Sequence, residues 1–135
     1  MSDIIKHECG IAFVRLLKPL DYYLEQYGTP LYGLKKLQLL LQKQRNRGQD
    51  GAGLATIKLD MPPGTRYISR KRSNASDPLR DLLLQVNAYF KNLPPETFRD
   101  TARLKQEFPF TGEVLLGHLR YATHGKNSIE QVHPV

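Results

Sequence analysis

The residue with the greatest capacity for covalent chemistry in this chain is Cys9, its single cysteine. A thiol is an effective side-chain nucleophile when a base activates it and nearby donors stabilise the developing oxyanion. Histidines later in the chain could supply such a base. A lone cysteine beside a strand is also commonly a small core residue. Residue type alone therefore leaves both a Cys-His enzyme and a structural thiol open.

Cys9 belongs to the first of three clusters in which an expected strand or helix end adjoins a glycine-bearing turn. Glycine at such turns lets the backbone approach a ligand closely. The clusters are His-Glu-Cys-Gly-Ile at 7–11, Arg-Asn-Arg-Gly-Gln-Asp-Gly-Ala-Gly at 45–53 and Gly-His-Leu-Arg-Tyr-Ala-Thr-His-Gly at 117–125.

Taken in this order, the three clusters resemble the glutaminase domain of the class II, or N-terminal nucleophile, glutamine amidotransferases. The glutamine at position 49 makes the middle cluster most similar to the amidophosphoribosyltransferase family. The resemblance implies glutamine hydrolysis that supplies ammonia for amidotransfer to phosphoribosyl pyrophosphate, the first step of purine synthesis. It also implies a four-layer αββα sandwich, incomplete in this chain.

The resemblance assigns a role to each matched residue. Cys9 matches the nucleophile, and its own α-amino group, with a pKa near 7.7–8.0 when free, would be the general base. Arg120 matches the arginine that holds the substrate carboxylate, a task suited to a planar guanidinium. Thr123 matches a residue of the loop that binds the substrate together with this arginine. Arg47 and Gly48 match residues that shape the pocket beside the nucleophile.

Simpler interpretations of the neighbouring residues also stay open. Arg47 fits a cation at a helix C-terminus, and Arg120 fits a surface charge at a strand end. His118 lies two residues from Arg120, so both would point to one face of a strand, and we interpret His118 as support for the pocket. The histidines lack zinc-ligand spacing, and we expect no metal site.

The match also predicts how the chain relates to a longer enzyme. Residues 1–8 would be a propeptide, because Cys9 must carry a free amine, and residues 9–135 would be the N-terminal part of a glutaminase domain. The family's Asn-Gly oxyanion site and its phosphoribosyltransferase domain would follow Val135. Magnesium or an iron–sulfur cluster would belong to that part. We expect this segment alone to be inactive and the full-length enzyme to be a homo-oligomer.

Two alternatives remain. One is another class II amidotransferase of the glucosamine-6-phosphate synthase type, which shares His124-Gly125 but usually has tyrosine at position 49. The other is a non-catalytic, basic binding module with the same fold, which would keep residues 1–8. The segment 60–112 is longer than the resemblance leads us to expect.

Composition limits the broad class of the protein. The chain has 135 residues, 40% of them hydrophobic and 24% charged, as expected for one soluble domain. No apolar run approaches the ~20 residues that a membrane-spanning helix needs, and the N-terminus is no secretory signal. The net charge of +7 favours anionic partners. We expect a cytoplasmic protein that binds glutamine, with no membrane or nucleic-acid partner.

Apolar spacing predicts a mixed α and β architecture with helices covering a sheet. The expected strands are 10–16, 51–59, 65–69 as the second arm of a hairpin, and 114–121. The expected helices are 31–48, one starting at Asp77-Pro78 and running to about 93, and one from Pro94-Pro95 to about 107. Residues 21–29 are expected to be a loop or a short helix. We interpret the basic residues at 66 and 70–72 as a solvated hairpin end rather than a nucleic-acid site.

Overall fold

Four strands form one antiparallel sheet in the order β1-β4-β2-β3 in the computed structural model, which describes residues 9–45, 50–121 and 128–135. The strands are β1 (Gly10–Arg15), β2 (Gly51–Ile57), β3 (Ile68–Ser73) and β4 (Val114–Arg120). The helices are α1 (Leu20–Tyr27), α2 (Tyr32–Lys43), α3 (Pro78–Ala88), α4 (Pro95–Arg99), α5 (Thr101–Glu107) and the 3-10 helix η2 (Ile129–Gln131). The predicted mixed α+β class is confirmed.

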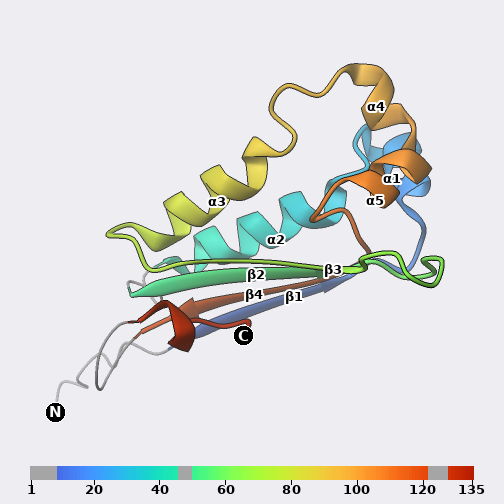
Figure 1. Cartoon of the computed structure of the whole chain (residues 1–135). Coiled ribbons are helices and arrows are strands. Elements are labelled where there is room, and N and C mark those ends of the chain that lie inside the picture. The colour runs from blue at the N-terminus through green and yellow to red at the C-terminus, as the bar shows by residue number, and fades with distance from the viewer. Residues whose placement is uncertain (1–8, 46–49, 122–127) are drawn as a thin grey trace, which may run out of the picture.

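The α-helices lie on one side of the sheet, and η2 lies on the other (Figure 1). Helix α2 packs on β1 and β4, whereas α3 packs on β2 and β3. Successive strand residues point to opposite faces, so Leu115, Gly117 and Leu119 of β4 face the helices and are buried. We call the opposite side, which carries Ile11, Phe13 and the remaining β4 side chains, the open face. Within the described residues, no helix has the length and apolarity to cross a membrane.

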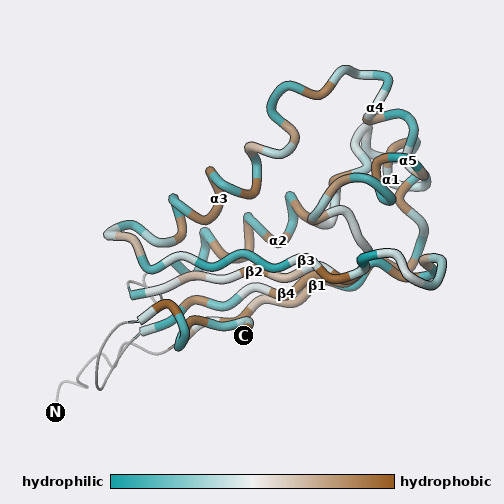
Figure 2. The backbone as a smooth tube through the Cα atoms, in the orientation of Figure 1, coloured by the Kyte–Doolittle hydropathy of each residue, from teal (hydrophilic) through white to brown (hydrophobic). Residues whose placement is uncertain are grey.

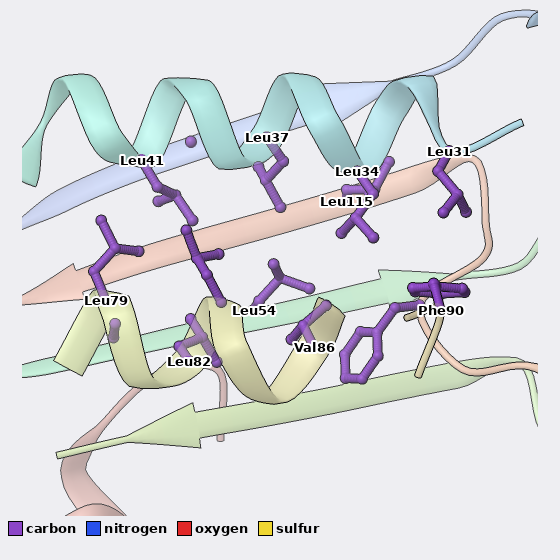
Figure 3. Close-up of a cluster of buried hydrophobic side chains, with 14 of the residues drawn as sticks. Leu31, Leu34, Leu37, Leu41, Leu54, Leu79, Leu82, Val86, Phe90 and Leu115 are labelled. Carbon is purple, nitrogen blue, oxygen red and sulfur yellow. The ribbon is translucent and has the colours of Figure 1, made fainter. Parts of the chain in front are cut away.

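The core lies between the two long helices and the sheet. Figure 3 shows the leucines of α2 pointing toward the sheet and toward side chains of α3. Leu37, Leu41 and Leu82 are completely buried. Burying one such side chain contributes about 1.5–3 kcal/mol relative to exposure. This packing holds the sheet in place and therefore fixes the ends of its strands.

Helix boundaries follow local capping chemistry. The predicted start at Asp77-Pro78 is confirmed, because the Asp77 carboxylate accepts a hydrogen bond from the Arg80 N–H at 3.5 Å. The helix ends at Ala88, before the predicted limit near 93. The predicted single helix after Pro94 is instead two, α4 and α5. Asp100 leaves helical geometry (φ −89°, ψ 79°) and caps α5 by accepting from the Arg103 N–H at 3.2 Å.

The hairpin differs from the prediction in its second arm. Strand β3 begins at Ile68, which pairs with Ile57, so the arm lies three residues later than expected. The turn contains two prolines, which have no N–H to donate to a ladder, and Gly64 has φ of +85°. The basic residues 70–72 therefore lie within an edge strand rather than at a hairpin end. Residues 21–27 belong to helix α1, which ends at Gly28 with φ of +78°.

Candidate functional site

The three clusters of the sequence meet at one end of the sheet, at least in their described parts. Strand β4 lies between β1 and β2, so its last residues neighbour the first residues of both. Gly10 pairs with Leu119 and Gly51 pairs with Arg120. The Asp50 N–H donates to the Arg120 carbonyl at 3.1 Å. Chain segments more than a hundred residues apart thus lie side by side at one end of the sheet.

Cys9 lies at this end of the sheet, immediately before β1, and it is exposed. Its Sγ accepts a hydrogen bond from the Tyr121 N–H at 3.4 Å and lies 3.9 Å from the Tyr121 carbonyl oxygen. A backbone N–H directed at sulfur can stabilise negative charge on it, while the carbonyl can accept the S–H. Because Cys9 is exposed, the interpretation of Cys9 as a small core residue is wrong.

Arg120, the last residue of β4, lies on the open face at the same end of the sheet. Its guanidinium donates to the Gln131 side-chain oxygen at 2.7 Å, which ties the end of β4 to η2. Strand alternation places His118 and Arg120 on one face, as predicted. Cys9 lies two residues before Ile11 and so continues the alternation of that same face. The predicted nucleophile and the predicted carboxylate-binding arginine therefore lie at the same end of the sheet. We call this region, with Cys9, Arg120 and Tyr121, the Cys9 corner.

Three further site residues were predicted from the sequence. Arg47, Gly48 and Thr123 lie outside the described residues. Within the described part of the chain, no three histidine, cysteine, aspartate or glutamate side chains are grouped so that they could hold a metal ion.

A segment that the sequence did not mark as part of the site crosses the open face. We call residues 128–135 the C-terminal strap. Val132 is completely buried, and its carbonyl accepts a hydrogen bond from Arg72 of β3 at 3.1 Å. A Cβ built on Gly53 would lie 1.7 Å from the His133 carbonyl oxygen, and one on Gly51 would lie 2.7 Å from a Val132 methyl carbon. These glycines, predicted to let a ligand approach, admit the strap instead.

We expect Gly53→Ala to displace the strap, because the added methyl would overlap backbone atoms. Overpacking of this kind typically costs about 1–3 kcal/mol. Urea unfolding measures the loss of stability, and the methyl NMR signals of Val132 report the position of the strap. Gly51→Ala is the matched control, since its methyl would meet a side chain that can rotate, and its effect should be smaller. Unchanged Val132 signals in Gly53→Ala would contradict this packing.

His118 lies beneath the strap. Its Nδ1 is buried without a hydrogen-bond partner within the described residues, and its ring meets the His133 ring edge-on at 5.1 Å between centroids. Burial lowers the pKa of His118 below its usual value, and the charges of His133 and Arg120 lower it further. A neutral imidazole at this position places a polar group near Arg120 without adding a second positive charge.

The lowered pKa of His118 predicts how stability depends on pH. The unfolded chain takes up the proton near pH 6.5, whereas the folded chain takes it up only at a lower pH. Stability should therefore be complete above pH 6.5 and fall as the pH drops, by at most about 1.4 kcal/mol per pH unit for this group. His118→Phe keeps a ring against His133 and should flatten this part of the profile in urea unfolding. An equally steep profile in His118→Phe would assign the dependence to other groups.

No protein-family model, curated protein sequence or solved structure matches the chain. The geometry of the corner and the three clusters of the sequence therefore carry the functional argument.

Proposed function

We propose that this chain forms the cysteine-bearing part of a glutaminase site, which supplies ammonia for amidotransfer to phosphoribosyl pyrophosphate in its parent enzyme. One observation carries the proposal: the exposed Cys9 thiol lies against the Tyr121 N–H, at the corner that Arg120 also occupies. A nucleophile, a backbone donor and a carboxylate-binding side chain are the groups that hydrolysis of an amino-acid side-chain amide needs.

The reaction follows from these groups. The Cys9 sulfur attacks the carboxamide carbon of glutamine, and the bond between that carbon and nitrogen breaks. The nitrogen takes a proton and leaves as ammonia, so that a γ-glutamyl thioester remains on the sulfur. Water then attacks the thioester, releases glutamate and returns the thiol. The planar guanidinium of Arg120 suits the α-carboxylate of glutamine, and Gln131 fixes its position.

The base in this proposal is the α-amino group of Cys9. A free α-amine has a pKa near 7.7–8.0 and can exchange protons with the thiol at neutral pH, whereas a peptide nitrogen cannot. The proposal therefore requires that residues 1–8 be removed. Arg47, Gly48 and Thr123 keep the roles that the resemblance gives them, beside the nucleophile and in the substrate loop.

We expect the parent protein to begin at Cys9 when it hydrolyses glutamine. N-terminal sequencing and intact-mass measurement of the same preparation that is assayed for ammonia release test this expectation. Glutamate release by protein that starts at Cys9 supports the proposal. Full activity in protein that still carries Met1 would overturn the role of the α-amine.

The open face supports the four-layer sandwich as the complete fold. Ile11 and Phe13 of β1 are 64% and 60% exposed, which is unusual for adjacent large apolar side chains on one strand face. Figure 2 shows how hydrophobic residues continue along β1 and β4. We propose that a second sheet packs on this face and completes the αββα arrangement, in a cytoplasmic homo-oligomer. Both faces of β1 carry apolar side chains, with Ala12 turned inward and these two residues outward, which suits a strand covered on both sides.

A further inference from the structure

A cavity lies at the end of the sheet opposite to Cys9. Its volume is about 310 Å³, within the range of small-molecule sites. The cavity lies where the β2–β3 hairpin meets the C-terminal ends of α3 and α5, and these elements are labelled in Figure 1. Its wall includes Lys58, Arg66, Ser69, Arg70, Tyr89 and Phe110.

Three of these residues, Lys58, Arg66 and Arg70, carry a positive charge. Lys58 is buried, with 7% of its surface exposed, and neither it nor Arg66 nor Arg70 forms an ion pair within the described residues. Lys58 is the most enclosed of the three, whereas Arg66 and Arg70 are exposed. Like charges gathered in one place repel one another and attract an anion. The concentration of positive charge around this cavity therefore points to a ligand that is negative.

Two carboxylates close to this cavity are already engaged. Glu107 also lines the cavity, but its carboxylate pairs with Arg103 at 2.7 Å. The buried Glu113 accepts from Lys105 at 2.7 Å and from the Leu59 N–H at 3.0 Å. Neither acid is within ion-pair distance of Lys58, so the protein does not supply the missing negative charge from these residues.

The lowered pKa of Lys58 is consistent with a binding site for an anion. Burial lowers the pKa of Lys58, and the positive charges of Lys105 and Arg66 lower it further. An anion bound in the cavity would oppose each of these effects, because it would stabilise the charged ammonium.

The remaining wall is aromatic and hydroxylic. The rings of Tyr89 and Phe110 lie 5.8 Å apart between centroids, in a tilted arrangement. Phe110 has φ of +62°, a left-handed conformation that is uncommon for an aromatic residue and that proteins retain mainly where the surroundings enforce it. Ser69 and Tyr89, which also line the cavity, are residues with a hydroxyl group.

We propose that this cavity binds a small phosphate monoester, with its phosphate at Lys58, Arg66 and Arg70 and its apolar part against Tyr89 and Phe110. Three cationic residues suit a group with close to two negative charges and several acceptor oxygens better than they suit a single carboxylate. The site shares no residue with the Cys9 corner and does not depend on the glutaminase proposal.

The test is an NMR titration of the full-length protein with phenyl phosphate at constant ionic strength. Inorganic phosphate and phenol serve as probes for the two halves of the ligand. We expect shifts of the Ser69, Arg70 and Phe110 amides, with phenyl phosphate binding more tightly than either half. Shifts spread evenly over the basic surface, or equal effects of sodium sulfate and phenyl phosphate, would overturn the proposal.

Variants separate this site from non-specific attraction by the positive net charge. Lys58→Met keeps nearly the length of the side chain and removes its charge. Arg70→Gln removes a charge from the exposed edge strand and keeps a polar, shorter side chain. Each should weaken phenyl phosphate binding by at least about tenfold. Lys43→Gln, at the exposed end of α2, is the control with the same charge change and should bind normally. If circular dichroism shows that Lys58→Met is unfolded, phenyl phosphate binding by Arg70→Gln decides between the two outcomes. Equal weakening in Arg70→Gln and Lys43→Gln would contradict a built site.

Discussion

Cys9→Ala in the full-length parent is expected to abolish glutamine-dependent synthesis and to leave synthesis from added ammonia intact. In the proposed reaction the Cys9 sulfur only releases ammonia, and a separate site uses it. The Cys9 side chain is exposed, so its removal should not disturb the core. Product formation measured with glutamine and with an ammonium salt, in parallel, gives both activities.

Cys9→Ser is the companion variant, because it keeps a polar group of similar size at the Tyr121 N–H. It should also lose glutamine-dependent synthesis, since a hydroxyl is a much weaker nucleophile near neutral pH. If both variants lose both activities, Cys9 has a structural role and the proposal fails. If Cys9→Ala keeps its glutaminase activity, another residue carries the reaction.

Arg120→Lys is expected to raise the KM for glutamine by about 10- to 150-fold. The substitution replaces a planar two-point donor with a single point charge, and losing a charge-assisted hydrogen bond typically costs about 1.5–3 kcal/mol. The net charge is unchanged, so long-range attraction of the substrate should persist. Steady-state kinetics on the full-length enzyme, together with urea unfolding, separate a binding defect from a folding defect.

Arg72→Lys is the matched control for this variant. Arg72 also lies on the open face and also holds the C-terminal strap, through the Val132 carbonyl, but it belongs to the edge strand far from Cys9 in the sheet order. It should leave the KM for glutamine nearly unchanged. An equal rise in both variants would show that the two arginines act by anchoring the strap. A normal KM for glutamine in Arg120→Lys would mean that Arg120 is a surface charge that does not bind the substrate.

Local patterns predicted most of the secondary structure. The apolar run after Cys9, the leucine spacing of α2 and the Asp77-Pro78 start of α3 depend on neighbours in sequence, which is why they could be recognised. The split between α4 and α5 was missed, although Asp100 belongs to a residue type that is favoured at N-caps and disfavoured in helix interiors. The later start of β3 was missed because register depends on pairing with β2, which local sequence does not encode.

The candidate site was predicted only in part, for a physical reason. The types of Cys9 and Arg120 indicated their chemistry, but their proximity depends on the placement of β4 between β1 and β2. The strap left a weaker signal. Gly51 and Gly53, alternate residues of one strand, indicated that something approaches the backbone closely, but not that residues 128–135 do so. The tie between Gln131 and Arg120 had no sequence signal.

The most direct test of the central claim is mass spectrometry of the full-length enzyme quenched in acid during turnover of glutamine. The account predicts one γ-glutamyl group per chain, on the peptide that begins at Cys9, held by a bond that hydroxylamine cleaves. Cys9→Ala should show no such adduct. Glutamine turnover with no adduct on Cys9, or with the adduct on another residue, would contradict the account.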